Sequence, residues 1–205
     1  MAEHGPRRSP AKRRAILDAA IKVFTDQGYA RASVDAIAAV AGVGKQTVYG
    51  HFGDKEQLFL AAIQEARSAV SAGDADGTAD VVLSGDPREG LTALGGRILD
   101  IALSPRVSAL HRLTIAEVAH HPELQRTWRG SSASADRAVV DYLRDCDADG
   151  RLRVPDPARA ARQFSHLVIT EGRVETAYGT LPLRPERRHA IAADAADLII
   201  RAHHP

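Results

Sequence analysis

Apolar residues recur at intervals of three and four along most of the chain, which is the spacing that places side chains on one face of an α-helix. The first such run extends from Ile16 to Phe24. Ser9 followed by Pro10 supplies an N-cap and a proline at the first helical position, and Gly28 supplies a terminator. The pattern predicts a helix over residues 10–27.

Comparable start signals precede the later apolar runs. They are Ser33, Asp54 with Gln57, Asp86-Pro87, Ser104-Pro105, His121-Pro122, Asp156-Pro157 and Arg184-Pro185. No segment alternates apolar and polar residues as a half-buried strand does. The sequence therefore predicts an all-α fold of about nine helices, with a flexible arm over residues 1–8, a first domain over 9–55 and a larger helical domain over 56–205.

Composition agrees with closely packed helices. The chain has 205 residues, of which 44% are hydrophobic but only 4% aromatic, so small aliphatic side chains must fill the core. Cys146 is the only cysteine and allows no internal disulfide. No apolar stretch approaches the roughly 18 residues that span a bilayer, and no apolar signal segment follows the charged start. We expect a cytoplasmic protein without a cofactor.

Charge is unevenly distributed. Residues 1–55 contain nine Lys or Arg and five Asp or Glu, a net +4, whereas the whole chain carries +1 and the remainder therefore −3. All four lysines lie in this first quarter. A small basic end joined to a mildly acidic body is expected when only that end meets a polyanion.

Residues 33–52 have the pattern of a helix-turn-helix. Two short apolar-periodic segments flank Gly-Val-Gly, where Gly42 permits a tight turn, and Ala38 is small enough for the helices to cross closely. Val43, Val48 and Phe52 would anchor the second helix, which leaves its other face for DNA. That face carries Lys45, Gln46, Thr47, Tyr49 and His51. Glutamine can pair bidentately with adenine, and threonine can offer its methyl group to thymine.

Residues 12–63 resemble the DNA-binding domain of the TetR family of bacterial transcriptional regulators. The resemblance rests on several motifs in order: Phe-x-x-x-Gly at the end of the first helix, Ser-Val-x-x-Ile-Ala, Ala-Gly-Val, and Thr-Val-Tyr-x-His-Phe-x-x-Lys-Glu-x-Leu. Gly44 departs from it, because many members have Ser or Thr there, and glycine can cap a helix but offers no hydroxyl to phosphate.

The resemblance implies roles for individual residues. Lys45, Gln46 and Thr47 would face the major groove, and Tyr49 and His51 would hold the DNA backbone. Lys55 would meet a phosphate, and Ser33 would cap the second helix and touch the backbone. For Arg7, Arg8, Arg13 and Arg14 two interpretations stay open, a flexible arm over the minor groove or a solubilising tail.

Helix-turn-helix proteins usually contact two half-sites as dimers, so we expect a homodimer on a palindromic operator in double-stranded DNA. In the resembled family the last two helices pair with their symmetry mates. The candidate interface residues lie on stripes of these helices, which could equally be intrachain core: Ala161, Val168, Gly172, Ile191, Ala195, Leu198 and Ile199.

The middle helices would enclose a pocket for a small-molecule effector of unknown identity. Its candidate residues bring polar groups or large rings to apolar faces, although most such residues are packing residues: Leu103, Leu110, His111, Thr114, Trp128, Phe164, Leu167 and Glu171. An effector would favour a body conformation in which the recognition helices no longer fit the operator.

Two metal-like patterns offer alternatives. Residues 145–156 have the spacing of a calcium loop, although Asp156 also fits the cap of the next helix. Glu117-x-x-His120 and Glu186-x-x-His189 match the motifs of ferritin-like di-iron bundles, which would make the chain an enzyme. We favour a dimeric, ligand-responsive DNA-binding repressor that is not an enzyme, with an activator on the same fold or a di-iron enzyme as alternatives.

Overall fold

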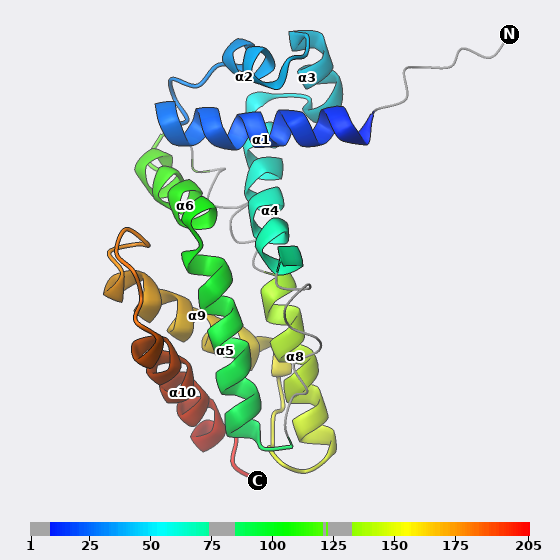
Figure 1. The fold of residues 1–205 in the computed structure, drawn as a ribbon. Helices are drawn as coiled ribbons and strands as arrows, with labels where there is room; N and C mark the ends of the chain where they lie inside the picture. Colours follow the sequence, from blue (N-terminus) through cyan, green and yellow to red (C-terminus); the bar gives the residue numbers. More distant parts are fainter. Residues whose placement is uncertain (1–8, 74–84, 121, 123–132) are drawn as a thin grey trace, which may run out of the picture. The chain divides into compact units, whose positions relative to one another are not determined.

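The computed structural model describes residues 9–73, 85–120, 122 and 133–205, and every regular element among them is an α-helix (Figure 1). The helices are α1 (Pro10–Gln27), α2 (Val34–Ala41), α3 (Lys45–Phe52), α4 (Lys55–Gly73), α5 (Pro87–Leu103), α6 (Pro105–Glu117), α8 (Ala133–Ala148), α9 (Pro157–Glu175) and α10 (Pro185–Ala202). The predicted all-α class is confirmed. The helix expected after His121-Pro122 falls largely outside the described residues.

Most of the predicted helix starts are correct because the capping interactions are local. Ser33 Oγ accepts the Ala36 N–H at 3.0 Å, and Asp54 Oδ1 accepts the Gln57 N–H at 2.7 Å. Asp86 and Asp156 accept amides from the first turns of α5 and α9 in the same way. Each cap satisfies a backbone donor that the helix itself leaves without a partner.

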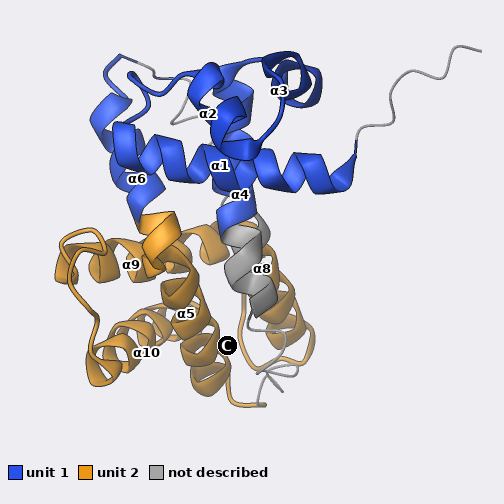
Figure 2. Cartoon of the chain, turned by 45° about the horizontal axis from the view of Figure 1, so that its top comes forward, with its two compact units in different colours: residues 1–68, 109–128 blue, residues 69–108, 129–205 orange. Residues whose placement is uncertain are grey.

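The chain forms two compact units, which Figure 2 distinguishes by colour. Unit 1 comprises residues 1–68 and 109–128, and unit 2 comprises residues 69–108 and 129–205. This division differs from the predicted boundary after residue 55. The greater part of α6 joins the helix-turn-helix in unit 1, although it follows α5 of unit 2 in the chain.

The core of unit 1 is built around three aromatic rings. Phe24 of α1 and Phe59 of α4 meet edge to face with centroids 5.0 Å apart, and Tyr29 stacks on Phe24 at 5.7 Å. Ile16, Leu17, Ile37 and Leu58 are fully buried in the same unit. These side chains bury the apolar faces of α1, α2 and α4 and so hold the short helix-turn-helix, which has little core of its own.

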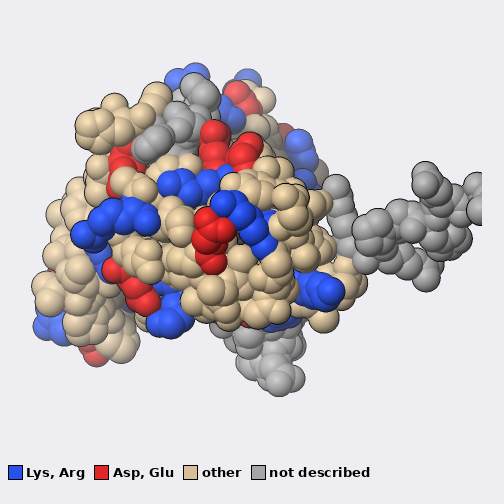
Figure 3. Space-filling model, turned by 90° about the horizontal axis from the view of Figure 1, so that it is seen from above, with Lys and Arg blue, Asp and Glu red and all other residues tan. Residues whose placement is uncertain are grey.

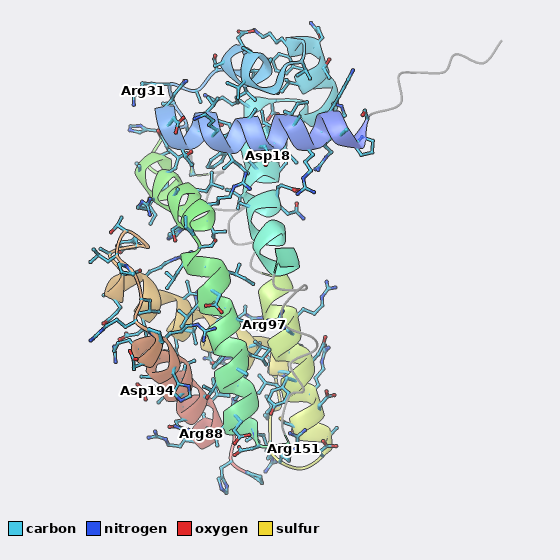
Figure 4. All side chains as sticks on the ribbon, in the orientation of Figure 1. Asp18, Arg31, Arg88, Arg97, Arg151 and Asp194 are labelled. Carbon is cyan, nitrogen blue, oxygen red and sulfur yellow. The ribbon has the colours of Figure 1, made fainter. Side chains whose placement is uncertain are left out.

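The core of unit 2 joins α5, α8, α9 and α10. Small residues set how closely these helices pack, since a Cβ on Gly95 would lie 2.9 Å from Ala192 Cβ and 3.1 Å from the Phe164 ring. Arg88 at the start of α5, labelled in Figure 4, fixes the edge of this core by two hydrogen bonds to Asp197 of α10, at 2.8 and 3.3 Å. The Arg88 guanidinium lowers the pKa of the Asp197 carboxyl.

None of the helices in the described part of the chain is both long enough and apolar enough to cross a membrane.

Candidate nucleic-acid interface

The helix-turn-helix has the predicted bounds and turn. Gly42 ends α2 in the left-handed conformation (φ 66°), its N–H donates to the carbonyls of Ala38 and Ala39, and the Val43 N–H donates to Ala38 O at 3.0 Å. Gly44 then precedes α3 with an extended backbone. Because a side chain at φ 66° would be strained, glycine at residue 42 allows only three residues to separate the end of α2 from the start of α3.

The second helix of the motif rests on one fully buried side chain. Val48 is 1% exposed, whereas Val43 and Phe52, which were also expected to anchor α3, are only half-buried. Phe52 instead lies under the Arg13 guanidinium, 5.4 Å from the ring centroid. A helix that buries so little of its own surface leaves most of its side chains available to a partner.

The predicted DNA-contacting residues of α3 differ in exposure. Lys45, Gln46 and Tyr49 are exposed, and Thr47 and His51 are half-buried. Lys45 lies over the Tyr49 ring, with Nζ 6.0 Å from the centroid. The structure thus brings an ammonium, an amide, a hydroxyl and two polar-tipped rings onto one short helix.

Lys45 also has a partner that the sequence did not indicate. Its Nζ donates to Asp35 Oδ2 of α2 at 2.8 Å, and this pairing raises the pKa of the Lys45 ammonium. Figure 3, which shows the molecule from the side on which α2 and α3 lie in Figure 1, shows acidic side chains interspersed among the basic ones. The Lys45 ammonium is therefore bound to a carboxylate of the same helix-turn-helix.

Lys55 points elsewhere. The Lys55 ammonium lies on the main-chain carbonyls that follow α1, 3.0 Å from Tyr29 O, 3.3 Å from Ala32 O and 3.5 Å from Ala30 O. Ser33 is exposed and caps α2 as expected. Arg7 and Arg8 lie outside the described residues, whereas Arg13 and Arg14 belong to α1 and are not part of a flexible arm.

The candidate pocket residues do not gather in one unit. Leu110, His111 and Thr114 belong to unit 1, whereas Leu103, Phe164, Leu167 and Glu171 belong to unit 2, and Trp128 lies outside the described residues. Thr114 and His111 are buried in α6. Leu167 is 42% exposed, and Glu171 lies on the surface with its carboxylate 3.6 Å from Arg187.

Six of the seven candidate interface residues are buried within the chain itself, so that only Leu198, which is 50% exposed, presents a large apolar surface. The six are Ala161, Val168, Gly172, Ile191, Ala195 and Ile199. Leu167 and Val174 of α9 are also exposed apolar residues. Helical periodicity alone did not separate these from the core residues.

The acidic residues of the metal-like patterns bind backbone amides and arginine. Within the described residues no three His, Cys, Asp or Glu side chains form a group that could hold a metal ion. Asp147 Oδ1 accepts the Val154 N–H at 2.7 Å, Asp149 pairs with Arg151, and Asp156 caps α9. The two Glu-x-x-His motifs fall in different units. Burial raises the pKa of the Cys146 thiol, which disfavours a reactive thiolate.

Comparison with known proteins defines the class. Residues 16–62 match the family described as bacterial regulatory proteins, tetR family, and residues 89–205 match the AefR-like transcriptional repressor C-terminal domain. The chain is 30% identical over 177 residues to the HTH-type transcriptional repressor Rv1474c of Mycobacterium tuberculosis, covering 85% of this chain and 87% of that protein.

Two further proteins are similar over most of their length. The HTH-type transcriptional regulator BetI of Rhizobium meliloti is 32% identical over 164 residues, 74% of each chain. The solved structure of the Flavonoid-responsive Regulator FrrA superposes with a TM-score of 0.74 at 26% identity, covering 96% of this chain and 99% of that one.

The fold, the exposed recognition helix and these relatives define a DNA-binding transcriptional regulator of the helix-turn-helix class. The chain belongs to the TetR family. Members of this family are regulators that bind DNA and typically dimerise, not enzymes, which excludes the di-iron enzyme considered from the sequence.

Proposed function

We propose that this chain represses transcription by binding an inverted-repeat operator as a homodimer and that a small molecule releases it. Repression is supported by the names of the relatives, since Rv1474c is described as a repressor and the matched C-terminal domain is that of AefR-like repressors. Activation on the same fold is the alternative. Either role would be exercised on DNA in the cytoplasm.

The observation that carries the DNA-binding proposal is the division of α3 into a buried and an exposed side. Val48 alone is buried, while Lys45, Gln46 and Tyr49 are exposed on a helix of eight residues. We assign base contact to Gln46, whose amide can donate to and accept from adenine. Lys45, Tyr49 and His51 suit phosphates, and Thr47 suits a thymine methyl group or a phosphate. Arg7 and Arg8 would add minor-groove or backbone contacts.

We assign dimerisation to the outer side of α9 and α10. Arg187 of α10 lies 3.6 Å from Glu171 and 3.2 Å from Glu175 of α9. These ion pairs place the three residues on one continuous surface formed by the two helices. Leu167 and Val174 follow this side of α9 at positions four before and three after Glu171, and Leu198 lies eleven residues after Arg187 on α10. Exposed apolar side chains that follow one helical stripe favour a protein partner.

For the effector, we propose contact with the buried polar residues of α6. Thr114 is fully buried and His111 is 8% exposed, three residues apart on one side of the helix. Most of α6 belongs to the unit that contains the helix-turn-helix, so a ligand touching this side would act directly on that unit. The similar FrrA is described as flavonoid-responsive, which supports a largely apolar small molecule with a few hydroxyl groups.

Selection of bound duplexes from a random pool tests the proposal as a whole. We expect the purified chain to enrich an inverted repeat and to protect both half-sites in a footprint. Enrichment of no sequence, at low and at physiological ionic strength, would exclude operator binding.

Two substitutions on α3 then test the assigned contacts. Gln46→Ala should relax the preference at one base pair of each half-site, worth about 1–3 kcal/mol of discrimination. Lys45→Ala should weaken all duplexes alike and reduce the slope of log K against log salt by about 0.9 per half-site. If both variants bind the selected and scrambled duplexes as the parent chain does, α3 is not the recognition helix.

Leu198→Glu tests the assigned dimer surface. A charged side chain at this half-exposed apolar position should convert the dimer into the 21.9 kDa chain, as measured by light scattering, and should weaken binding to the two-half-site duplex. Ile115→Glu on α6 is the matched control, since Ile115 is 46% exposed and lies off the assigned surface. A dimeric Leu198→Glu protein would refute this surface.

A further inference from the structure

The turn between α1 and α2 is a junction of several helices. Gly28 follows α1 at φ 83°, and the Ala32 N–H donates to Gly28 O at 3.1 Å, which closes the turn over residues 28–32. Arg31, labelled in Figure 4, stays local, because its Nε donates to Gln27 O at 2.9 Å. The turn leads directly into the Ser33 cap of α2, so its position fixes where the helix-turn-helix begins.

Lys55, the first residue of α4, binds this turn from one side. Three carbonyls of the turn, those of Tyr29, Ala30 and Ala32, lie within 3.5 Å of its ammonium nitrogen. The same nitrogen lies 4.4 Å from the centroid of the Tyr29 ring, which is only 4% exposed. An ammonium group has three N–H donors, and these carbonyls can use all of them.

Helix α6 meets the same turn from another side. Glu117 Oε1, 87 residues further along the chain, accepts the Ala30 N–H at 3.4 Å. A methyl group in place of the Gly28 hydrogen would lie 4.0 Å from Leu113 Cδ1, so this helix also packs against the start of the turn. Ala30 therefore has its carbonyl near an α4 side chain and its N–H bound to an α6 side chain.

We propose that Lys55 is a positioning residue whose ammonium holds the turn 28–32 against α4, and that this turn, bound also by Glu117, sets the placement of the helix-turn-helix. This role deepens the proposed DNA-binding function and rests on it for the consequences in binding. It differs from the role implied by the family resemblance, in which the Lys55 ammonium contacts a DNA phosphate. The two roles predict opposite results.

A phosphate ligand is replaceable by any cation that reaches DNA, and its loss changes the salt dependence of binding. A lysine that collects three converging carbonyls is not replaceable by arginine, since a planar guanidinium spreads its donors over three nitrogens. Its loss removes the donor that these carbonyls share and loosens the turn, while the number of phosphates contacted stays the same.

The experiment compares Lys55→Met and Lys55→Arg in the full-length protein. The DNA probe is the duplex that the parent chain selects from a random pool, titrated over a range of salt concentrations. Amide exchange at Ala30 and Ala32 reports on the turn without DNA. Lys22→Met is the control for removing a lysine from unit 1, because Lys22 is exposed and pairs with Asp26 one turn on. Lys45→Met is the control for loss of a proposed phosphate contact.

We expect both Lys55 variants to bind about tenfold more weakly or worse, with a salt slope equal to that of the parent, and to exchange the two amides about tenfold faster. Lys22→Met should leave the affinity, the salt slope and the amide exchange unchanged. Lys45→Met should lower the salt slope without changing the amide exchange. The proposal is overturned if Lys55→Arg binds like the parent while Lys55→Met lowers the slope by about 0.9 with unchanged exchange.

The outcomes also separate this proposal from the function on which it rests. If the parent chain selects no duplex, the proposed function fails, but amide exchange still decides whether Lys55 holds the turn. Circular dichroism establishes that each variant is folded. Should Lys55→Met not fold, Lys55→Arg and Glu117→Ala decide the matter, the latter by faster exchange at Ala30 alone.

Discussion

The recognition helix of unit 1 and the last two helices of unit 2 use their side chains in opposite ways. Helix α3 buries one residue of eight, whereas α9 and α10 bury six residues each. On α3 the side chains proposed to contact DNA are polar and mostly exposed, so the sequence motif alone is enough to predict them. On α9 and α10 the apolar stripes are buried in the core of unit 2, and only exposed residues beside these stripes are available to a partner.

Phe164→Ala should have the largest effect on stability. Phe164 is fully buried among α5, α9 and α10, and removal of a buried phenyl ring costs about 3–5 kcal/mol in transfer and cavity free energy. Urea unfolding followed by circular dichroism would measure the loss. Arg162→Ala, an exposed position two residues earlier on α9, should stay within about 0.5 kcal/mol of the parent. A loss of less than about 1 kcal/mol for Phe164→Ala would mean that unit 2 lacks a tightly packed core.

Glycines provide a more direct contrast between the two regions. A Cβ on Gly90 of α5 would collide with the Tyr142 side chain, whereas nothing lies within 4 Å of a Cβ on Gly50 of α3. Gly90→Ala should therefore destabilise by about 1–3 kcal/mol, because the buried Tyr142 ring must move. Gly50→Ala should stabilise by about 0.5–1 kcal/mol, because alanine costs less backbone entropy in a helix.

The same unfolding experiment measures both glycine variants. Equal signs for the two would contradict the different surroundings of these helices. DNA binding by Gly50→Ala adds a second observation, since lost affinity in a stabilised protein would mean that DNA approaches the α3 backbone closely at residue 50.

The sequence predicted the local features and not those that depend on distant parts of the chain. Caps such as Ser33 and Asp54 and the turn at Gly42 are determined within three or four residues, so their spacing is sufficient to predict them. The bond between Ala30 and Glu117 joins residues 87 positions apart, and no local pattern marks it. The association of most of α6 with unit 1 is unpredictable for the same reason.

The candidate site shows the same limit. The exposed face of α3 follows from one apolar anchor, Val48, and from the polar residues around it. Lys55 occupies the motif position that the family resemblance assigns to phosphate, yet its ammonium lies on three carbonyls, and this depends on how the turn after α1 folds back onto α4. On α10, Ile199 is 4% exposed and Leu198 is 50% exposed, a difference that periodicity alone left open.

Tyr142 gives a small effect on stability together with a specific spectroscopic one. Burial raises the pKa of this phenol from 10 to about 12, and its hydroxyl donates to Asp86 O at 3.1 Å. The folded state therefore favours the neutral phenol, and this contribution to stability is complete below pH 10 and lost as the pH rises towards 12. Ultraviolet titration of the folded protein should show the Tyr142 phenol ionising near pH 12.

Tyr142→Phe should abolish that late transition and cost about 0.5–1.5 kcal/mol at neutral pH, the usual net value of one hydrogen bond. Circular dichroism at each pH separates ionisation in the folded state from alkaline unfolding. Tyr178→Phe is the control, because Tyr178 is 46% exposed and its substitution should leave the late transition in place. If the late transition persists in Tyr142→Phe, the phenol held between α5 and α8 is not its source, and the packing assigned to this edge of unit 2 is wrong.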